Sequence, residues 1–306
     1  QFLSSFPVLV RKLKESNMQG KLNAIVRLVL LWISGLSTEP GPIPPSYLER
    51  LRDLLAAAHP PFKPKMKDGK PEYAQQDAEE GLTAILGALS TEFAQRGMED
   101  PKELIGAQLI ERKICTDCTT TSDTPATQVV IQVPLPNPNG ERTDGGNGEG
   151  ESVALFDLLL GLIGEEIIEY RCCAEGRASS SKLFVAISRH IFIQCLRYRK
   201  VRVNGRKRFV KNTCKVIVPL TMNFGRLVDE EYAHNSKVID YRLKSILIHD
   251  GTDVRSGHYY SIVFDEESGA WLECDDHRVR RITEEQAMDA ATGAYLLGFE
   301  RVNDEQ

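Results

Sequence analysis

A histidine and an aspartate near the C-terminus have the types and spacing of a catalytic base and its orienting carboxylate. Gly257 lets the backbone turn tightly before His258, and the aromatic run that follows predicts a strand that would hold the imidazole still. Asp275 ends the next predicted strand, so a hairpin would bring it beside His258, where a carboxylate fixes the tautomer and supports the imidazolium. The alternative is a surface histidine and an ordinary acidic turn at Asp275 and Asp276, and spacing alone leaves both interpretations open.

A second polar cluster precedes a helical pattern in "YAQQDAEEGLTAIL", residues 73–86. Asp77 has the position of a helix N-cap, with Glu80 in the first turn. Gln75 and Gln76 add nothing to such a cap, and their amides would suit a cleft as donors and acceptors. Capping and binding therefore both stay open for Asp77.

The elements that must position these groups change along the chain from helices to strands. Apolar residues recur at helical spacing in residues 2–13, 22–33, 46–55 and 75–95. From Leu104 onward, apolar runs bounded by turn residues predict strands instead. Helices first and a largely antiparallel sheet second predict an α+β fold, with a cleft where the two parts meet.

Two segments among the predicted strands are polar. Residues 137–152, "NPNGERTDGGNGEGES", predict a flexible insertion. Asn204-Gly205 predicts a two-residue hairpin turn within the strongly basic segment 197–211. We interpret this hairpin as a solvated edge protected by charge, with contact to an acidic partner surface as the alternative.

Composition excludes several classes of protein. The 306 residues carry a net charge of −5, which argues against a general nucleic-acid binder, and the longest apolar run, residues 28–33, is too short to span a bilayer. Seven cysteines, an odd number, do not suggest a disulfide framework. They predict a reducing compartment, cytoplasmic or nuclear.

The sequence resembles the ubiquitin-specific protease family of deubiquitinating cysteine proteases. Three boxes carry the resemblance, "YAQQDAEEGL", "GHYYSIVFD…WLECDDHRV" and "AYLLGFERV", and they stand in the family's order. The runs "HIFIQCLRYRK" and "CKVIVPLTM" fall where that family has strands, so the resemblance covers nearly the whole chain. "GPIPPSYLERLRDLL" and "GLIGEEI" are most similar to the proteasome-associated branch.

The resemblance implies a papain-like fold, with a helical thumb-like subdomain over residues 1–103 and a β-rich palm and fingers subdomain over 104–306. It makes His258 the general base and Asp275 its partner, with Asp276 beside the oxyanion region. By the same resemblance, Gln75 and Asp77 would meet the arginine-bearing C-terminal tail of ubiquitin, and Gly257 and Tyr259 would line the narrow channel for that tail. A tail ending in Gly-Gly requires a tight channel, and a cationic tail suits a carboxylate. Residues 249–257 are expected to form a mobile gate beside that channel.

The nucleophile that His258 would serve is not recognisable in the sequence. The family's cysteine lies in a Gly-Asn-Thr-Cys box that is absent here, and "QFLSSFPVLVRKL" resembles the segment after that box, with Gln1 at the family's glutamine. We therefore expect the nucleophile upstream of Gln1. A competing alignment puts Gly20 of "MQGKLNA" at the cysteine position, which would make an inactive enzyme. It is disfavoured because it needs many substitutions and leaves too little chain before Gln75.

The cysteines that are present suggest other roles. Cys195 and Cys214 are expected to be small core residues. Cys274 should face away from His258 if Asp275 faces it. Cys115 and Cys118 form a CxxC pair, which many relatives combine with a second CxxC to hold structural zinc. Here the second pair is the adjacent Cys172-Cys173, and adjacent strand residues point to opposite faces. We expect a region without metal, with three ligands and a water as the alternative, and no cofactor.

The function implied by the resemblance is deubiquitination, the thiol-dependent hydrolysis of the isopeptide bond at the C-terminal glycine of ubiquitin. The expected partners are ubiquitin, ubiquitinated proteins and the proteasome, with neither nucleic acid nor membrane. A non-catalytic, ubiquitin-binding scaffold within a larger complex is the alternative. The residue at the nucleophile position distinguishes the two, because only the enzyme requires cysteine there. An unrelated α+β binding domain is the third interpretation.

Overall fold

A computed structural model of the chain describes most of its residues. These are residues 26, 29, 45–68, 70–72, 77–98, 100–136, 152–173, 176–203, 206–232, 239–253 and 256–302. The helices predicted within 2–13 and 22–33 lie outside the described residues, except that Val26 and Val29 are helical and buried. The flexible insertion predicted for 137–152 also lies outside them, apart from Ser152, which begins a strand.

The chain divides into two compact units. The first combines Gln1–Leu104, Tyr198–Lys211 and Leu247–Thr283, and the second combines Ile105–Arg197, Asn212–Ile246 and Glu284–Gln306. The boundary falls within strand β14 (Asp240–Asp253), so β14 contributes to both units. The predicted subdomains 1–103 and 104–306 stay a prediction.

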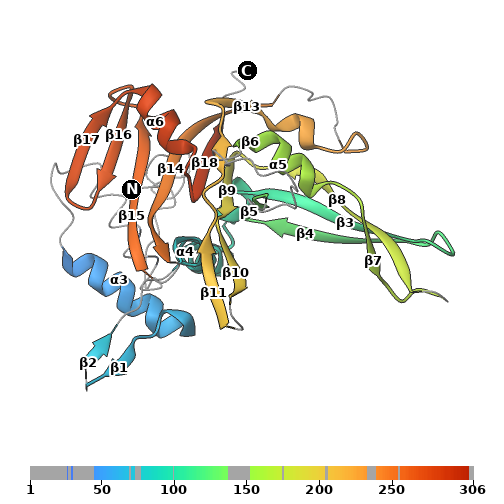
Figure 1. Cartoon of the computed structure of the whole chain (residues 1–306), viewed down its shortest axis with the longest axis horizontal. Helices are drawn as coiled ribbons and strands as arrows, with labels where there is room; N and C mark the ends of the chain where they lie inside the picture. The colour runs from blue at the N-terminus through green and yellow to red at the C-terminus, as the bar shows by residue number, and fades with distance from the viewer. Residues whose placement is uncertain are drawn as a thin grey trace. The chain divides into compact units, whose positions relative to one another are not determined.

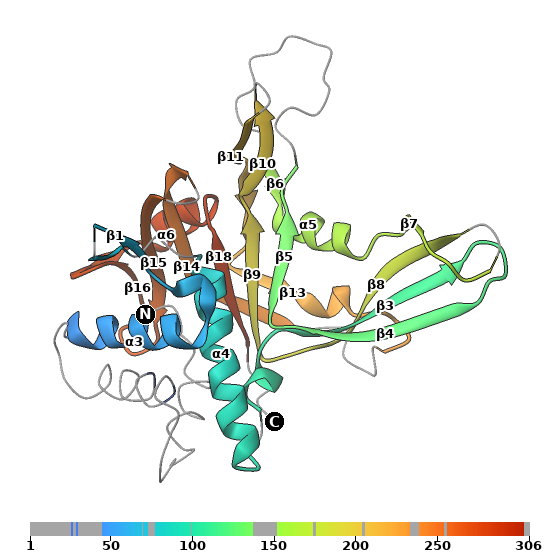
Figure 2. The ribbon, with the colours of Figure 1, turned by 90° about the horizontal axis from the view of Figure 1, so that it is seen from below.

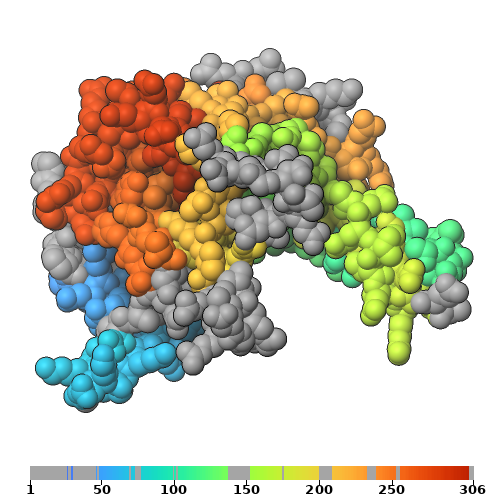
Figure 3. Space-filling model, viewed as in Figure 1, coloured from blue at the N-terminus to red at the C-terminus, as the bar shows by residue number. Residues whose placement is uncertain are grey.

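The first unit combines helices with short antiparallel strand pairs (Figure 1). Its elements are α3 (Pro45–Ala58), η2 (Pro60–Phe62), β1 (Lys65–Lys67), β2 (Lys70–Glu72), α4 (Ala78–Gln95), η3 (Pro101–Leu104), β10 (Tyr198–Val203), β11 (Arg206–Lys211), β15 (Ser256–Asp265), β16 (Ala270–Asp275) and β17 (Arg278–Ile282). Strands β17, β16, β15 and β14 follow one another in the order of a larger sheet. The side chains of the β1–β2 hairpin are exposed, and its atoms stand out at the surface in cyan (Figure 3).

Helix α4 is amphipathic and begins at a defined cap. Its buried leucines recur at helical spacing, as Leu82, Leu86 and Leu89. Asp77 is extended and its Oδ1 accepts a hydrogen bond from the backbone N–H of Glu79 over 2.8 Å. The predicted start near residue 75 is therefore wrong, because an N-cap residue has non-helical backbone angles and the helix begins after it.

The hairpin predicted at Asn204-Gly205 is confirmed. Strands β10 and β11 pair antiparallel, with Val203 opposite Arg206 at the turn and Tyr198 opposite Lys211 at the base. The two turn residues themselves lie outside the described residues.

The second unit is built mainly of strands (Figure 2). Its elements are β3 (Ala107–Cys115), β4 (Thr121–Gln128), β5 (Val130–Pro134), β6 (Ser152–Ala154), α5 (Leu155–Leu162), β7 (Glu166–Glu169), β8 (Arg177–Ile187), β9 (His190–Leu196), β12 (Lys215–Ile217), β13 (Thr221–Asn223), η4 (Phe224–Leu227), α6 (Glu284–Ala291) and β18 (Leu296–Arg301). Strands β14, β18, β9 and β5 continue the larger sheet, and β4, β3, β8 and β7 form a second one. Among the strand pairs whose register is described, β5 with β9 and β12 with β6 are parallel and the others are antiparallel. The predicted α+β class is confirmed.

Strand β9 shows why the larger sheet is stable. It lies between β18 and β5, and all of its residues except Leu196 are buried, which suits the continuous apolar run Ile191–Ile193. None of the helices in the described ranges combines the length and apolar character needed to cross a bilayer.

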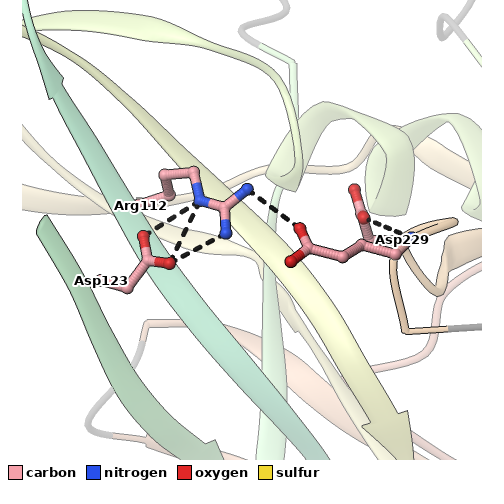
Figure 4. Close-up of polar contacts among 4 residues, drawn as sticks. Arg112, Asp123 and Asp229 are labelled. Carbon is pink, nitrogen blue, oxygen red and sulfur yellow. Dashed lines mark hydrogen bonds and ion pairs between the residues drawn. The ribbon is translucent and has the colours of Figure 1, made fainter. Parts of the chain in front are cut away.

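An arginine on the surface of the second sheet binds two acidic residues (Figure 4). Arg112 on β3 donates to Asp123 on β4 through Nε over 3.0 Å and Nη2 over 2.8 Å, and its Nη1 reaches Glu231 over 3.3 Å. The carboxylate of Asp229 accepts from the backbone N–H of Glu231, which orders that loop. Two parallel bonds to one carboxylate fix geometry better than a single surface ion pair does.

Candidate active site

The structure brings the predicted histidine and aspartate together. Strands β15 and β16 pair with Ser261 opposite Cys274, and one step further along the ladder places Asp275 level with Tyr260. Residues two apart on a strand share a face, so His258 lies diagonally across from Asp275. The imidazole Nε2 donates a hydrogen bond to Oδ1 of Asp275.

This pair favours the charged form of the His258 imidazole. Both side chains are substantially exposed, at 45% for His258 and 40% for Asp275. The hydrogen bond to Asp275 is the main cause that raises the pKa of His258 above its ordinary value, and the Asp276 and Asp250 carboxylates act in the same direction. Because Nε2 is engaged by Asp275, Nδ1 is the ring nitrogen that would exchange a proton with a reacting group.

Asp276 occupies the turn next to this pair. Its φ is +50°, the left-handed region that aspartate tolerates better than most residues, and Asp275 pairs with Arg278 to close the two-residue loop. One ligand atom each from His258, Asp275 and Asp276 lie within 4.8 Å of one another. The carboxylate of Asp276 therefore adds negative charge beside the imidazole, and its predicted oxyanion role stays a prediction.

Position 257 has no room for a side chain, so it requires glycine. A Cβ at this position would lie 2.5 Å from the carbonyl oxygen of Asp250 and 2.6 Å from Nε2 of His249, closer than such contacts are found. The Tyr259 ring lies 4.4 Å from the His249 ring, centroid to centroid. The backbone around His258 is thus tightly packed on the side of β14, and the predicted channel role of Gly257 and Tyr259 stays a prediction.

The other predicted tail-binding residues are only partly described. Asp77 caps α4, which bears out the capping interpretation. Its charge also acts on His249, where it opposes the lowering of that pKa. Gln75 lies outside the described residues. The tail-binding roles of both residues stay predictions.

Sequence reasoning missed a cluster centred on His249. This side chain is 2% exposed, and its Nδ1 shares a hydrogen bond with the hydroxyl of Tyr198. Lys211 Nζ donates to the His249 carbonyl oxygen over 2.6 Å. The available signal was a histidine that ends the apolar run 246–248, but the partners are distant in sequence. The segment 249–257, predicted as a mobile gate, is strand over 249–253 and again at 256 and 257.

Three cysteines have buried surroundings that do not suit a nucleophile. The prediction that Cys195 and Cys214 are core residues is confirmed, and Cys274 is buried as well. Burial raises the pKa of Cys195 to about 11 and also raises that of Cys274. Cys274 is opposite Ser261 on the ladder, one position out of phase with Asp275.

The remaining four cysteines come together in the second unit. Cys115 Sγ lies 3.5 Å from Cys173 Sγ, and Cys118 Sγ lies 3.6 Å from Cys172 Sγ. The prediction that the adjacent pair points to opposite faces of a strand is wrong, because Cys172 and Cys173 lie in a bend between β7 and β8.

These thiols fit a structural zinc ion. Tetrahedral ligands at about 2.3 Å from zinc stand about 3.8 Å apart, close to the observed separations. Cys115, Cys118 and Cys172 offer atoms within 4.8 Å of one another, and Asp117 lies in a second such group. Hydrogen bonding to Thr120 is the main cause that lowers the pKa of Cys118 to about 6, which favours the thiolate that zinc binds. The predicted lack of metal stays a prediction.

Comparisons with known proteins agree on one family. A family model described as ubiquitin carboxyl-terminal hydrolase matches residues 2–299. Ubiquitin carboxyl-terminal hydrolase 44-A of Xenopus laevis is 23% identical over 257 residues, which is 76% of this chain and 36% of that protein. Ubiquitin carboxyl-terminal hydrolase 26 of Arabidopsis thaliana is 32% identical over 85 residues, 27% of this chain and 8% of that protein. The chain thus spans about a third of the length of the first relative.

A solved structure has the same fold. It is a chain of the SAGA DUB module, which contains Ubp8, Sgf11, Sus1 and Sgf73 and is bound to monoubiquitin. The match has a TM-score of 0.72 at 17% identity and covers 99% of this chain and 65% of that one. At this identity the likeness establishes the fold, and it agrees with the fold expected from the sequence.

Proposed function

The chain belongs to the ubiquitin carboxyl-terminal hydrolase family, and on that premise we propose that it carries the catalytic histidine and aspartate of a deubiquitinase. The reaction is the hydrolysis of the isopeptide bond after the C-terminal glycine of ubiquitin. The observation that carries the proposal is the hydrogen-bonded pair His258–Asp275 on adjacent strands. A family member that only binds ubiquitin has no chemical use for this pair, which counts against the scaffold alternative.

In the proposed mechanism His258 shuttles one proton. Nδ1 takes the proton of a cysteine thiol, the thiolate attacks the carbonyl carbon of the terminal glycine, and the imidazolium returns the proton to the departing lysine amine. Water then attacks the thioester with His258 again as the base, which releases the ubiquitin carboxylate and restores the thiol. Asp275 holds the Nε2–H tautomer and stabilises the imidazolium throughout.

The nucleophile in this proposal is a cysteine upstream of Gln1. Cys195, Cys214 and Cys274 are buried, and the other four cysteines cluster in the second unit, which supports a nucleophile other than these seven. Asp77 and Gln75 would meet the cationic tail of ubiquitin, Gly257 and Tyr259 would line its channel, and Asp276 would sit beside the oxyanion.

The wider setting of the reaction is also part of the proposal. Ubiquitinated proteins are the proposed substrates, in the cytoplasm or nucleus, as the cysteine usage suggests. The proteasome is a proposed partner on the resemblance of residues 41–55 and 161–167 alone.

The test uses the full-length source protein and ubiquitin that carries a C-terminal electrophile, followed by mass spectrometry of the adduct. We expect one adduct on a cysteine upstream of Gln1, and slower labelling in the His258→Ala variant. His277→Ala is the matched control, because His277 is an exposed histidine in the neighbouring turn. An adduct on one of the seven cysteines would refute the placement of the nucleophile. Binding without labelling would favour the scaffold.

A further inference from the structure

The side chain of His249 occupies the space that Gly257 leaves open. A Cβ on Gly257 would lie 2.6 Å from Nε2 and 2.8 Å from Cε1 of the His249 ring. The ring is also packed against Tyr259, at 4.4 Å between centroids and an interplanar angle of 47°. His249 therefore contacts the strand immediately before and after His258, while the proposed mechanism assigns it no role.

The base of the β10–β11 hairpin holds His249 from its other side. Tyr198 and Lys211 face each other in the ladder. Tyr198 bonds the ring at Nδ1 and also donates to the Gly251 carbonyl over 3.3 Å, while Lys211 bonds the backbone of His249. Ring and backbone are thus fixed by two opposed residues of one hairpin, which leaves the imidazole little rotational freedom.

The burial of His249 favours its neutral form. Burial is the main cause that lowers its pKa, the Lys211 ammonium lowers it further, and Asp77 and Asp250 act in the opposite direction. A neutral imidazole packs against Gly257 without a charge that would repel a protonated His258.

We propose that His249 is a positioning residue: it holds the Gly257 backbone, and through it His258, in the place from which His258 reaches Asp275. The hairpin base, Tyr198 and Lys211, is its support. The proposal rests on the proposed deubiquitinase function, and it adds a histidine that never touches the substrate. A one-ångström displacement of a catalytic group costs roughly 10²-fold in rate, so a support of this kind has a measurable effect.

The experiment measures two properties of His249→Ala and Tyr198→Phe in the full-length protein. The first is kcat and KM on ubiquitin with a C-terminal fluorogenic amide, and the second is the titration of the His258 imidazole by NMR. We expect His249→Ala to lower kcat roughly 10- to 10²-fold with little change in KM. We also expect the His258 titration to move toward lower pH in both variants, because a displaced imidazole loses its bond to Asp275.

Tyr198→Phe removes only a hydroxyl, so it keeps the test valid should His249→Ala fail to fold. Tyr232→Phe, the same change at a half-exposed tyrosine of the second unit, is the control and should alter neither property. An unchanged His258 titration and unchanged kcat in both variants would overturn the proposal. The titration needs no turnover, so an inactive parent protein would count against the proposed function and leave this readout intact.

Discussion

Two histidine–carboxylate pairs in this chain have opposite titration behaviour. His258 and Asp275 are about two-fifths exposed and directly hydrogen-bonded, and the pKa of His258 is raised. His190 and Glu300 are 0% and 6% exposed, with 4.0 Å between Nδ1 and Oε1. Burial, with help from the Arg189 charge, lowers the pKa of His190 to about 3. The His190 imidazole is therefore neutral at ordinary pH, and its proximity to Glu300 is not an ion pair.

The difference shows that a nearby carboxylate does not by itself make a histidine basic. For His258 the hydrogen bond to Asp275 outweighs the desolvation that lowers its pKa. For His190 desolvation is the main cause and the Arg189 charge adds to it, and burial likewise raises the pKa of Glu300. A histidine that must exchange protons during turnover needs the first environment. The second suits a residue that stabilises the fold in one protonation state.

The largest expected effect comes from removing the exposed imidazole. His258→Ala should lower kcat/KM of the full-length enzyme by roughly 10²- to 10⁴-fold, because the proton acceptor is lost. The free energy of unfolding should change by less than about 0.5 kcal/mol, since the site is exposed. Turnover of a fluorogenic ubiquitin substrate measures kcat/KM, and urea denaturation measures the free energy of unfolding. A loss of activity matched by an equal loss of stability would mean that the pair is structural.

The Asp275→Asn substitution separates orientation from proton transfer. We expect kcat to fall roughly 10²-fold or more, because the amide no longer favours the Nε2–H tautomer. The raised pKa of His258 places the acid limb of the pH–rate profile above 6.5, the ordinary value for histidine. This limb should move to lower pH in the variant, because the main cause of the raised pKa is gone. The pH dependence of kcat/KM measures this shift. If the acid limb stayed at the same pH in the variant, Asp275 would not control the titration of His258.

The buried pair should respond in stability rather than in rate. His190→Ala should lower the free energy of unfolding by roughly 2–4 kcal/mol through the cavity it creates, with normal activity per folded molecule. The folded pKa of His190 is depressed, so its contribution is present above about pH 6.5 and is lost as pH falls toward 3. The difference between parent and variant in urea denaturation should therefore narrow over that range. His59→Ala, a partly exposed histidine, is the control, and a difference independent of pH would contradict the assignment.

The smallest effect is expected at Asp276. Its charge contributes less than Asp275 to the raised pKa of His258, so Asp276→Asn should shift the acid limb by less than Asp275→Asn does. Asparagine tolerates the positive φ, so stability should stay within about 0.5 kcal/mol of the parent. The same pH–rate measurement tests this prediction. A shift larger than that of Asp275→Asn would mean that Asp276 contributes more than Asp275 to the raised pKa of His258.

Features carried by local sequence patterns were predictable. The apolar stripe of α4, the hairpin turn at Asn204-Gly205 and the approach of Asp275 to His258 each depend on residues that are close in sequence or joined by one turn. Their periodicity and turn chemistry are sufficient to place them.

Features that depend on several distant segments were not predictable. The His249 cluster joins β10, β11, β14 and β15, so no spacing along the chain reveals that Tyr198 meets His249. The bend at Cys172-Cys173 was mistaken for strand, because the alternation rule was applied where the backbone is not extended. Long-range packing and irregular backbone thus account for the errors.

The exposed thiol of Cys118 has a consequence for chemical labelling. With a pKa of about 6, this group is roughly nine-tenths thiolate at pH 7, whereas the buried Cys195 and Cys274 stay protonated. A small alkylating reagent such as iodoacetamide should therefore modify Cys118 readily when no metal ion occupies the cysteine cluster. Inactivation by such reagents reports on the cysteine cluster as much as on a catalytic thiol, and only an electrophile delivered by ubiquitin itself is selective.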